Sequence, residues 1–390
     1  MNDLDLHRYK NIHLVGVGGC GMSGIAKILQ EMGFKVSGSD VKEGVNTIRL
    51  KDLGVKIYIG HEASQVRDAD LLVYSSAVTS DNPELVEALA KGIRIVKRAE
   101  ALAWIIERSK ERIAVAGTHG KTTTTAMLAK VLEASRLAPT YLIGCDMDYA
   151  DGNAKLGGGR YVVSEADESD SSFLFYSPTV EVITNIEADH MEHFGSMEEL
   201  FATFEKFAGR LASGGFIALD GTDPYNQALM DSVDQRFITY GLDKKMEYYA
   251  ADLRYNHFSS TYTLFKKGET IGDVNLSVPG WQNVLNSLAV FAVGYEFGLD
   301  FSTVAGALQT FVGARRRFST VGEQNEVLII DDYAHHPTEV RATLTAARSG
   351  WPGRRIIAIF QPHRYTRTML LKDKFSGAFD AADKVIITDI

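Results

Sequence analysis

The stretch "NIHLVGVGGCGMSGIAKILQEMGFKVSGSD" occupies residues 11–40 and decides the expected fold of the first part of the chain. Residues 12–17 predict a buried strand. A helix should follow, because apolar residues recur at helical spacing on one face at Met22, Ile25, Leu29 and Met32. Gly33 ends this helix, and a second strand begins at Phe34. Strand, glycine turn, helix and strand form a βαβ unit, which predicts a parallel sheet.

The turn of this unit carries the pattern G-x-G-x-x-G at Gly16, Gly18 and Gly21, with Gly19 between them. Asp40 follows at the end of the second strand, where a dinucleotide-binding protein has an acid for a ribose hydroxyl. The chemistry is more general, because glycines let the backbone approach any diphosphate and the helix N-terminus supplies N–H donors. The loop therefore predicts a site for NAD or for a UDP-sugar, and a glycine turn used only for packing is the alternative.

A second glycine loop lies in "AVAGTHGKTTTTAM", residues 114–127. The usual phosphate-binding loop is G-x-x-x-x-G-K-[ST], and Val115 occupies the place of its first glycine. The loop nevertheless follows a predicted strand and opens a predicted helix, which points backbone N–H groups and Lys121 at phosphates and the Thr122 hydroxyl at Mg²⁺. We expect an ATP site formed by Gly117, Thr118, His119, Gly120, Lys121, Thr122 and Thr123.

Acidic residues and histidines follow two later strands, in "YVVSEADESD" and "ITNIEADHMEH". They are Glu165, Asp167, Glu168, Asp170, Glu187, Asp189, His190 and His193. Mg²⁺ needs only one or two protein carboxylates besides phosphates and water. Most of these acids must therefore have other roles, and we expect Asp167, Glu168 and Asp170 to cap a helix and solvate its first turn.

Composition excludes several classes of protein. The 50 acidic and 41 basic residues give a net charge of −9, which argues against nucleic-acid binding. No apolar run approaches the roughly 18 residues of a membrane span, and "MNDLDLHRYK" lacks the apolar core of a signal peptide. Cys20 and Cys145 have no CxxC spacing, so neither a structural disulfide nor a zinc site is expected. We expect a cytoplasmic protein.

The chain is long enough for several α/β domains, and we place them at residues 1–107, 108–313 and 314–390. Apolar strands alternate with helical stretches through the second segment. The third contains two more strand–helix pairs, in "NEVLIIDDYAHHPTEVRATLTAAR" and "RRIIAIFQPHRYTR". It stops directly after the strand "ADKVIITDI". Because an α/β sheet is normally covered by helices on both faces, we expect this third domain to be incomplete.

Ordered motifs along nearly the whole chain resemble those of the Mur ligases, ATP-dependent enzymes that assemble the peptide of bacterial cell-wall precursors. The resemblance implies an α/β fold of three domains, with a Rossmann-like N-terminal domain, a central P-loop ATPase domain and a Rossmann-like C-terminal domain. It also accounts for the shortened loop, which is the form this family uses. The motifs are "VGGCGMSGIA", "VSGSD", "VYSSAV", "AVAGTHGKTTTT", "EADESDSSFL", "TNIEADHM", "VPGWQNVLNSLA", "RRRF", "DDYAHHPTEV" and "FQPHRYTRT".

Within the family, the motifs are most similar to those of the member that joins L-alanine to UDP-N-acetylmuramate. In the reaction that this implies, the sugar carboxylate attacks the γ-phosphate of ATP, and the amine then displaces phosphate from the acyl phosphate. The first glycine loop, with Asp40, Ser75 and Ser76, would bind the UDP-sugar. Lys121 would neutralise the β- and γ-phosphates. Thr122 and Glu165 would hold one Mg²⁺, and His190 a second metal ion.

The resemblance assigns further residues to the nucleotide and the amino acid. Asn283 and Asn286 would contact the adenosine and Arg317 the ATP, although Gln282 replaces the family's usual histidine. Arg364 and Arg367, three residues apart on one helix face, would bind the amino-acid carboxylate. The same pocket would be lined by Tyr333, His335 and His363.

Three other functions remain open on the sequence. They are an NAD-dependent oxidoreductase read from the first glycine loop, a protein that hydrolyses ATP as a switch, and the family member that recycles a whole tripeptide. The expected partners are small molecules, with no nucleic acid and no membrane, and the protein would be a monomer or homodimer. Because one methylene changes binding by only about 1–3 kcal/mol, we expect leakage from L-alanine to glycine and L-serine.

Overall fold

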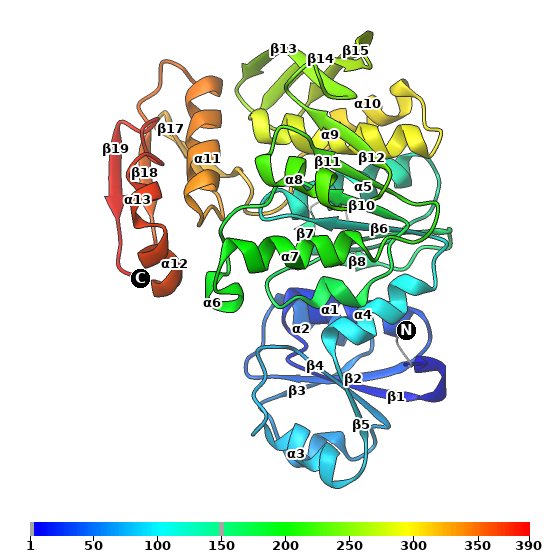
Figure 1. Ribbon diagram of the computed structural model, residues 1–390. Helices are drawn as coiled ribbons and strands as arrows, with labels where there is room; N and C mark the ends of the chain where they lie inside the picture. Colours follow the sequence, from blue (N-terminus) through cyan, green and yellow to red (C-terminus); the bar gives the residue numbers. More distant parts are fainter. Residues whose placement is uncertain (1–3, 148–151) are drawn as a thin grey trace.

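The computed structural model describes residues 4–147 and 152–390. Figure 1 shows an N-terminal sheet, a central sheet and a C-terminal region beside the central one. No helix in these two ranges combines the length and the apolarity that crossing a membrane requires.

The N-terminal region is built on a parallel sheet with five strands among the residues described. In spatial order they are β3 (Lys56–Ile59), β2 (Lys35–Asp40), β1 (Asn11–Val15), β4 (Leu71–Tyr74) and β5 (Arg94–Lys97). The helices are η1 (Leu6–Arg8), α1 (Cys20–Glu31), α2 (Val45–Asp52), η2 (Ala63–Val66), α3 (Pro83–Ala90) and α4 (Arg98–Glu107).

The predicted βαβ unit is confirmed as β1, α1 and β2. Met22, Ile25 and Leu29 are buried on one face of α1, as the helical spacing requires. Met32 forms the C-cap, and Gly33 follows at a φ of 90°, a conformation that favours glycine. The glycine loop therefore leads directly from a buried strand into the N-terminus of a buried helix.

The central region contains a mixed sheet with ten strands in the described part of the chain. In spatial order they are β15 (Glu269–Leu276), β14 (Ser259–Lys266), β13 (Tyr248–Asn256), β12 (Phe237–Gly241), β11 (Phe216–Asp220), β10 (Val180–Ile183), β6 (Glu111–Ala116), β9 (Tyr161–Glu165), β7 (Thr140–Met147) and β8 (Gly152–Lys155). Neighbouring strands from β13 to β7 run parallel, so the carboxyl ends of β6, β9 and β10 meet at one edge.

Helices cover this sheet and connect its strands. They are α5 (Lys121–Ala134), η3 (Ser172–Phe175), α6 (Met191–Phe194), α7 (Met197–Ala208), α8 (Pro224–Ser232), α9 (Trp281–Glu296) and α10 (Phe301–Gln309). The predicted strand at residues 113–116 is the carboxyl end of β6, and α5 begins at Lys121, so the strand–loop–helix context of the second glycine loop is confirmed.

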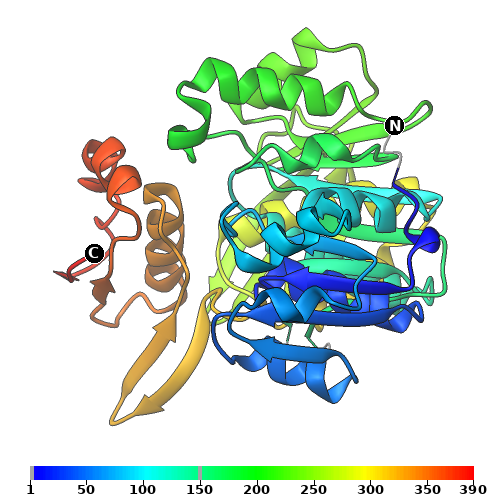
Figure 2. The same ribbon diagram turned by 90° about the horizontal axis from the view of Figure 1, so that it is seen from below.

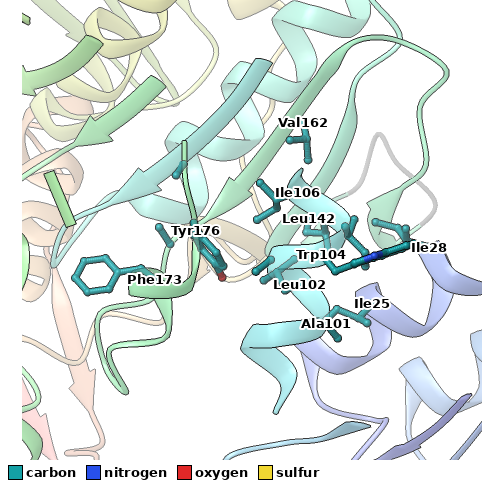
Figure 3. Packing of buried hydrophobic residues seen from close by; sticks show 14 of the residues in the cluster. Ile25, Ile28, Ala101, Leu102, Trp104, Ile106, Leu142, Val162, Phe173 and Tyr176 are labelled. Carbon is teal, nitrogen blue, oxygen red and sulfur yellow. The ribbon is translucent and has the colours of Figure 1, made fainter. Parts of the chain in front are cut away.

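The N-terminal and central regions share one hydrophobic core, and α4 lies within it. Seven of its residues are buried, including Leu102 and Trp104. Figure 3 shows part of this core, with Ile25, Ile28, Ala101, Leu102, Trp104, Ile106, Leu142, Val162, Phe173 and Tyr176. Apolar contact between the two regions fixes the position of the first glycine loop relative to the central sheet.

The C-terminal region contains an antiparallel hairpin, which Figure 2 shows extending away from the central sheet, and a pair of parallel strands. The hairpin consists of β16 (Ser319–Gln324) and β17 (Val327–Asp331), and the parallel pair of β18 (Ile357–Phe360) and β19 (Lys384–Ile387). The helices are α11 (Pro337–Gly350), α12 (Tyr365–Leu370) and α13 (Lys372–Phe375). Both predicted strand–helix pairs are confirmed, as β17 with α11 and β18 with α12.

Candidate active site

A cavity of about 260 Å³ opens where the second glycine loop faces the C-terminal region. Its walls come from the carboxyl edge of the central sheet and from α11, α12 and the segments that precede them. Most lining residues are predicted nucleotide, metal or amino-acid residues: Thr118, His119, Gly120, Lys121, Thr122, Glu165, His190, Arg317, Tyr333, His335, His363, Arg364 and Arg367. The other four are Asp167, Ser169, Asp189 and Glu339. Side chains that are far apart in the sequence therefore face one space.

The second glycine loop has a backbone that only glycine accommodates at its two ends. Gly117 and Gly120 have φ values of 121° and 86°, and a Cβ at Gly117 would collide with the Thr184 hydroxyl. The loop is held against the end of β10, where Thr118 N donates to Asn185 O at 2.9 Å. The loop therefore has a fixed shape and leads directly into the N-terminus of α5.

Lys121 points back along this loop. Its Nζ donates to the carbonyl oxygen of Gly117 at 2.6 Å and to both carboxylate oxygens of Glu168 at 2.8 Å. Burial raises the pKa of Glu168 to about 7 although Lys121 opposes the shift. Burial favours the neutral form of Lys121, but the charges of Glu168, Asp167 and Glu165 together outweigh it and raise the lysine pKa. An entering phosphate would thus compete with Glu168 for the lysine.

The expectation that the three acids after Glu165 cap a helix and solvate its first turn is wrong for Asp167 and Glu168. Only the short helix η3 follows them; its N-cap is Ser171, and of the three acids only Asp170 accepts from its first amide, at Ser172. Asp167 and Asp170 accept hydrogen bonds from the amides of Ser169 and Ser172, respectively, two residues on. Such short-range bonds form tight turns in place of a helix. These turns leave Glu168 turned inward to Lys121.

Thr122, Glu165 and His190 form the polar side of the cavity where metal ions were expected. Burial raises the pKa of Glu165, although the Gly144 amide, Lys121 and the Thr122 hydroxyl all favour its ionised form. The His190 pKa is lowered by burial, with Lys121 and Arg367 adding to that effect and Asp189 opposing it. A neutral imidazole beside a hydroxyl and a carboxylate is a donor set that fits divalent cations.

The first glycine loop lies in the N-terminal region and not among the residues lining this cavity. Gly16 has a φ of 80°, and a Cβ there would press on Ser75 at 3.2 Å. Ser76 is exposed next to it. Asp40 accepts a hydrogen bond from Gly18 N at 2.9 Å, so its carboxylate is engaged with the loop itself. Gly19 caps α1 without a side chain, which leaves space before the helix N-terminus.

The two arginines of the C-terminal region are both paired with carboxylates of the central region. Arg367 is buried on α12 and binds both oxygens of Asp189, at 2.8 and 3.1 Å. Burial favours the neutral acid, but the hydrogen bonds from Arg367 hold the pKa of Asp189 at about 2. Arg364 binds Glu192 at 2.7 Å. It is the N-cap of α12, at a φ of 65°, so the two arginines do not share a helix face as the sequence suggested.

The remaining predicted residues of this region lie around the arginines. His335 Nδ1 is 2.8 Å from the carbonyl oxygen of Tyr333, and the two rings meet edge to face. The ring of His363 is 6.4 Å from that of His335. Burial lowers the pKa of His335. This wall therefore offers a phenol and imidazoles next to two guanidinium groups.

The predicted adenosine residues lie behind the second glycine loop. The Asn286 amide oxygen accepts from Thr124 on α5 at 3.2 Å, and a Cβ at Gly120 would meet it at 2.6 Å. Asn283 donates to Pro279 O at 2.7 Å and accepts from Asn286. Asn283 and Asn286 do not line the cavity. Of the other residues predicted for the nucleotide, Gly117 and Thr123 do not line it either, and Arg317 does. The Gln282 side-chain oxygen is buried without a hydrogen-bond partner among the described residues.

Glu339 lines the cavity and was not predicted from the sequence. It lies at the N3 position of α11, where its carboxylate accepts from the amides of His335 and His336 at 3.0 and 3.2 Å. The sequence signal was present, because a Glu three residues after a capping residue is typical of a capping box. The same carboxylate also reaches His119 of the glycine loop, at 3.2 Å, which a local pattern does not predict.

Three family models match consecutive parts of the chain. Residues 11–110 match the Mur ligase family catalytic domain, residues 115–294 the Mur ligase middle domain, and residues 316–390 the Mur ligase glutamate ligase domain. With a phosphate-binding loop on a largely parallel sheet, they define an α/β nucleotide-binding ligase.

Individual relatives agree over nearly the whole chain. A UDP-N-acetylmuramate–L-alanine ligase of Pelobacter propionicus is 46% identical over 98% of this chain and 83% of the relative, and one of Sorangium cellulosum is 45% identical over 98% and 82%. The crystal structure of a UDP-N-acetylmuramate–alanine ligase from Thermotoga maritima matches with a TM-score of 0.85 at 36% identity, covering 97% of this chain and 85% of that one. The chain belongs to the Mur ligase family.

Proposed function

We propose that the protein is an ATP-dependent ligase that joins the amine of L-alanine to the carboxylate of UDP-N-acetylmuramate, in the synthesis of peptidoglycan precursors. The observation that supports it best is that one cavity is lined by Lys121, Thr122, Glu165, His190 and the two arginines. A carboxylate, a phosphate and an amino acid could meet there. The relatives' names supply the identity of the two substrates.

The phosphate end of the cavity would bind ATP. The amides at the start of α5 and Lys121 Nζ would contact the phosphates, with Glu168 giving up the lysine as they enter. Asn283 and Asn286 would stabilise the loop and the adenosine, and Arg317 would contact the nucleotide from the other wall. Positioning and charge neutralisation supply most of the catalysis of phosphoryl transfer, and these are the roles of the chain's own groups here.

Divalent metal ions fit the donor set of the same wall. Thr122 and Glu165 would hold one Mg²⁺ through oxygen atoms, and His190 would hold a second metal ion, because the pKa of His190 is lowered and its ring is available in the neutral form. The ions would reduce the repulsion between the sugar carboxylate and the γ-phosphate. The Asp189 carboxylate accepts from the backbone amide of His190 at 2.8 Å and so fixes the backbone from which the His190 ring extends.

The UDP-sugar would bind at the first glycine loop. The open N-terminus of α1 at Gly18 and Gly19 would receive the diphosphate, and Ser75 and Ser76 would flank it. Asp40 would hold the loop in shape and would not contact the ribose directly, because its carboxylate already accepts the hydrogen bond of Gly18 N. This arrangement requires no nicotinamide cofactor, so we retain the ligase over the oxidoreductase.

The amino acid would bind at the opposite wall. Its carboxylate would take the place of Asp189 or Glu192 on Arg367 and Arg364, and Tyr333, His335 and His363 would surround its amine and methyl group. We place the protein in the cytoplasm as a monomer or homodimer.

Phosphate release from ATP tests this function, with UDP-N-acetylmuramate and L-alanine each supplied or omitted. We expect release to require both substrates and Mg²⁺, with one amide formed for each ADP. ATP hydrolysis without an amide product would show the switch function instead. Reaction with a tripeptide but not with L-alanine would assign the recycling ligase.

A further inference from the structure

A cluster of metal-ligating side chains lies beside the cavity, and only one of its members, His119, belongs to the loop proposed to bind ATP. Its possible ligands are His119, Glu187 and His336, whose donor atoms all lie within 4.8 Å of one another. They come from the second glycine loop, the segment after β10 and the N-cap of α11. In residues 4–147 and 152–390 no other such group of three is found. Glu187 and His336 do not line the cavity, so the cluster is distinct from Thr122, Glu165 and His190.

The distances approach those of a tetrahedral metal site. His119 Nε2 and His336 Nδ1 lie 3.9 and 3.8 Å from the same Glu187 oxygen. The two rings are 4.5 Å apart. In a tetrahedral zinc site with bonds of about 2.0–2.1 Å, neighbouring ligand atoms are roughly 3.4 Å apart. Small side-chain movements would therefore bring all three atoms onto one ion.

One ligand atom has no other partner. His119 Nε2 is buried and makes no hydrogen bond with any described residue, because Glu187 at 3.9 Å is too distant. Only 11% of the His119 side chain is exposed, and His336 is fully buried. A buried nitrogen left unpartnered in a polar cluster costs free energy unless something binds it.

The second ring nitrogen of each histidine already has a contact, as in established metal sites. His119 Nδ1 faces Glu339 at 3.2 Å, and His336 Nε2 faces the Ala188 carbonyl at 3.3 Å. The Thr338 hydroxyl donates at 2.7 Å to the same Glu187 oxygen that faces the two histidines, and so orients that carboxylate. These contacts leave His119 Nε2 and His336 Nδ1 as the atoms turned to the centre. The amide of Thr338 approaches His336 Nδ1 at 3.3 Å, and this weak capping contact is what an ion would displace.

The ligand types select the metal. Two imidazole nitrogens and one carboxylate suit Zn²⁺ and related transition-metal ions, whereas Mg²⁺ prefers oxygen ligands alone. The carboxylates of Glu187 and Glu339 would balance the charge of a divalent ion. We propose that His119, Glu187 and His336 form a Zn²⁺ site that joins the nucleotide loop to α11 of the C-terminal region.

Binding of Zn²⁺ in the presence of excess Mg²⁺ tests the site, by equilibrium dialysis of the full chain. The wild type should bind one Zn²⁺ per chain, and His336→Asn and Glu187→Gln should bind it at least tenfold more weakly. Asn is a good N-cap and Gln keeps an acceptor for Thr338, so both variants should fold. His257→Asn is the matched control, because His257 is exposed and its positive φ tolerates Asn, and it should bind as the wild type does.

His190→Asn separates this site from the one proposed for Mg²⁺. Retention of Zn²⁺ in His190→Asn supports the proposal, and its loss there with retention in His336→Asn would overturn it. Visible absorption of the Co²⁺ form of the wild type gives a second measurement that needs no variant. A four-coordinate spectrum is expected, and a six-coordinate, all-oxygen spectrum would refute the site.

Discussion

Lys121 is the residue through which the second glycine loop would act, and it is already neutralised by Glu168. An incoming phosphate can replace Glu168 as the partner of Lys121, because its oxygen atoms accept the same hydrogen bonds and carry more negative charge. Glu168 thereby holds Lys121 against the second glycine loop, and it does not occupy the N-terminus of α5.

Replacement of Lys121 by Ala should reduce ADP formation by at least about 10²-fold, since a positive group at the transferring phosphate is lost. Binding of the UDP-sugar at the N-terminal region should persist, and isothermal titration measures it separately from turnover. Lys51→Ala, which removes an exposed lysine on α2, is the control. Loss of both binding and turnover in Lys121→Ala would contradict the assignment of the two substrates to different loops.

Glu181 is a residue whose position carries an energetic cost. It lies in the middle of β10, fully buried, and neither carboxylate oxygen has a hydrogen-bond partner in the described residues. Burial raises its pKa well above the usual value. The folded protein therefore keeps a proton that the unfolded chain loses above about pH 4.5, and this group's contribution to stability is complete below that pH and falls as pH rises.

Glu181→Met should make the protein more stable at neutral pH and flatten the decline of stability above about pH 4.5. The slope attributable to this group is at most about 1.4 kcal/mol per pH unit, until the pH reaches the folded-state pKa. Urea unfolding at several pH values measures it. Glu269→Met, on the exposed surface of β15, is the matched control, and equal pH profiles for the two variants would contradict the interpretation.

Helix α4 is the element that joins two regions into one core. The boundary that we drew at residue 107 is also the end of this helix, but the side chains of α4 pack in a cluster that includes both α1 and strands of the central sheet. The helix therefore fixes the position of the first glycine loop relative to the central sheet. The division into residues 1–107, 108–313 and 314–390 remains a proposal about folding units.

Leu102→Ala in α4 should lower the free energy of unfolding by about 2–5 kcal/mol, because it leaves a cavity in the shared core. The exposed fractions are 5% for Leu102 and 69% for Leu89 of α3. Leu89→Ala therefore makes the same chemical change on a helix surface and should cost less than about 0.5 kcal/mol. Chemical denaturation measures both, and a similar cost for the two would show that α4 is not part of the core.

At the scale of the whole molecule, polar pairs between the central and C-terminal regions lie at the cavity, and Phe258 of the central region also packs against Phe318 and Trp351 of the C-terminal region. Arg367 with Asp189, Arg364 with Glu192, and His119 with Glu339 all cross this boundary. Burial and two hydrogen bonds make the first pair the strongest of them. The same guanidinium groups would therefore connect the regions and receive the amino acid.

Arg367→Lys should raise KM for L-alanine at least tenfold and leave the KM for ATP nearly unchanged. A lysine is a point charge and cannot replace the planar fork that binds both carboxylate oxygens. Arg354→Lys, at the exposed pair with Glu323, is the control. Initial rates over a range of both substrates give the two constants. A rise in KM for ATP alone would place Arg367 in the nucleotide site.

The elements of the fold were largely predictable, and for a local reason. Each signal involves residues that are close in the sequence. These signals are the spacing of apolar residues in α1, the glycines at the two ends of α1, and the strand–loop–helix order around Lys121. The error at Glu168 and the helix face expected for Arg364 have the same origin. Both depend on short turns, at Asp167 and at the N-cap of α12, that compete with a helix and leave only a weak sequence signal.

The sequence by itself determined the α/β class, the two glycine loops and the family, because these follow from periodicity and from motifs of a few adjacent residues. Only the tertiary structure decided which groups face one another. Arg367 is 178 residues from Asp189, and Glu339 is 220 residues from His119. The packing of whole regions decides which residues meet at such separations. A charged group that packing buries costs free energy unless it has a partner, so the buried groups must meet with matching partners.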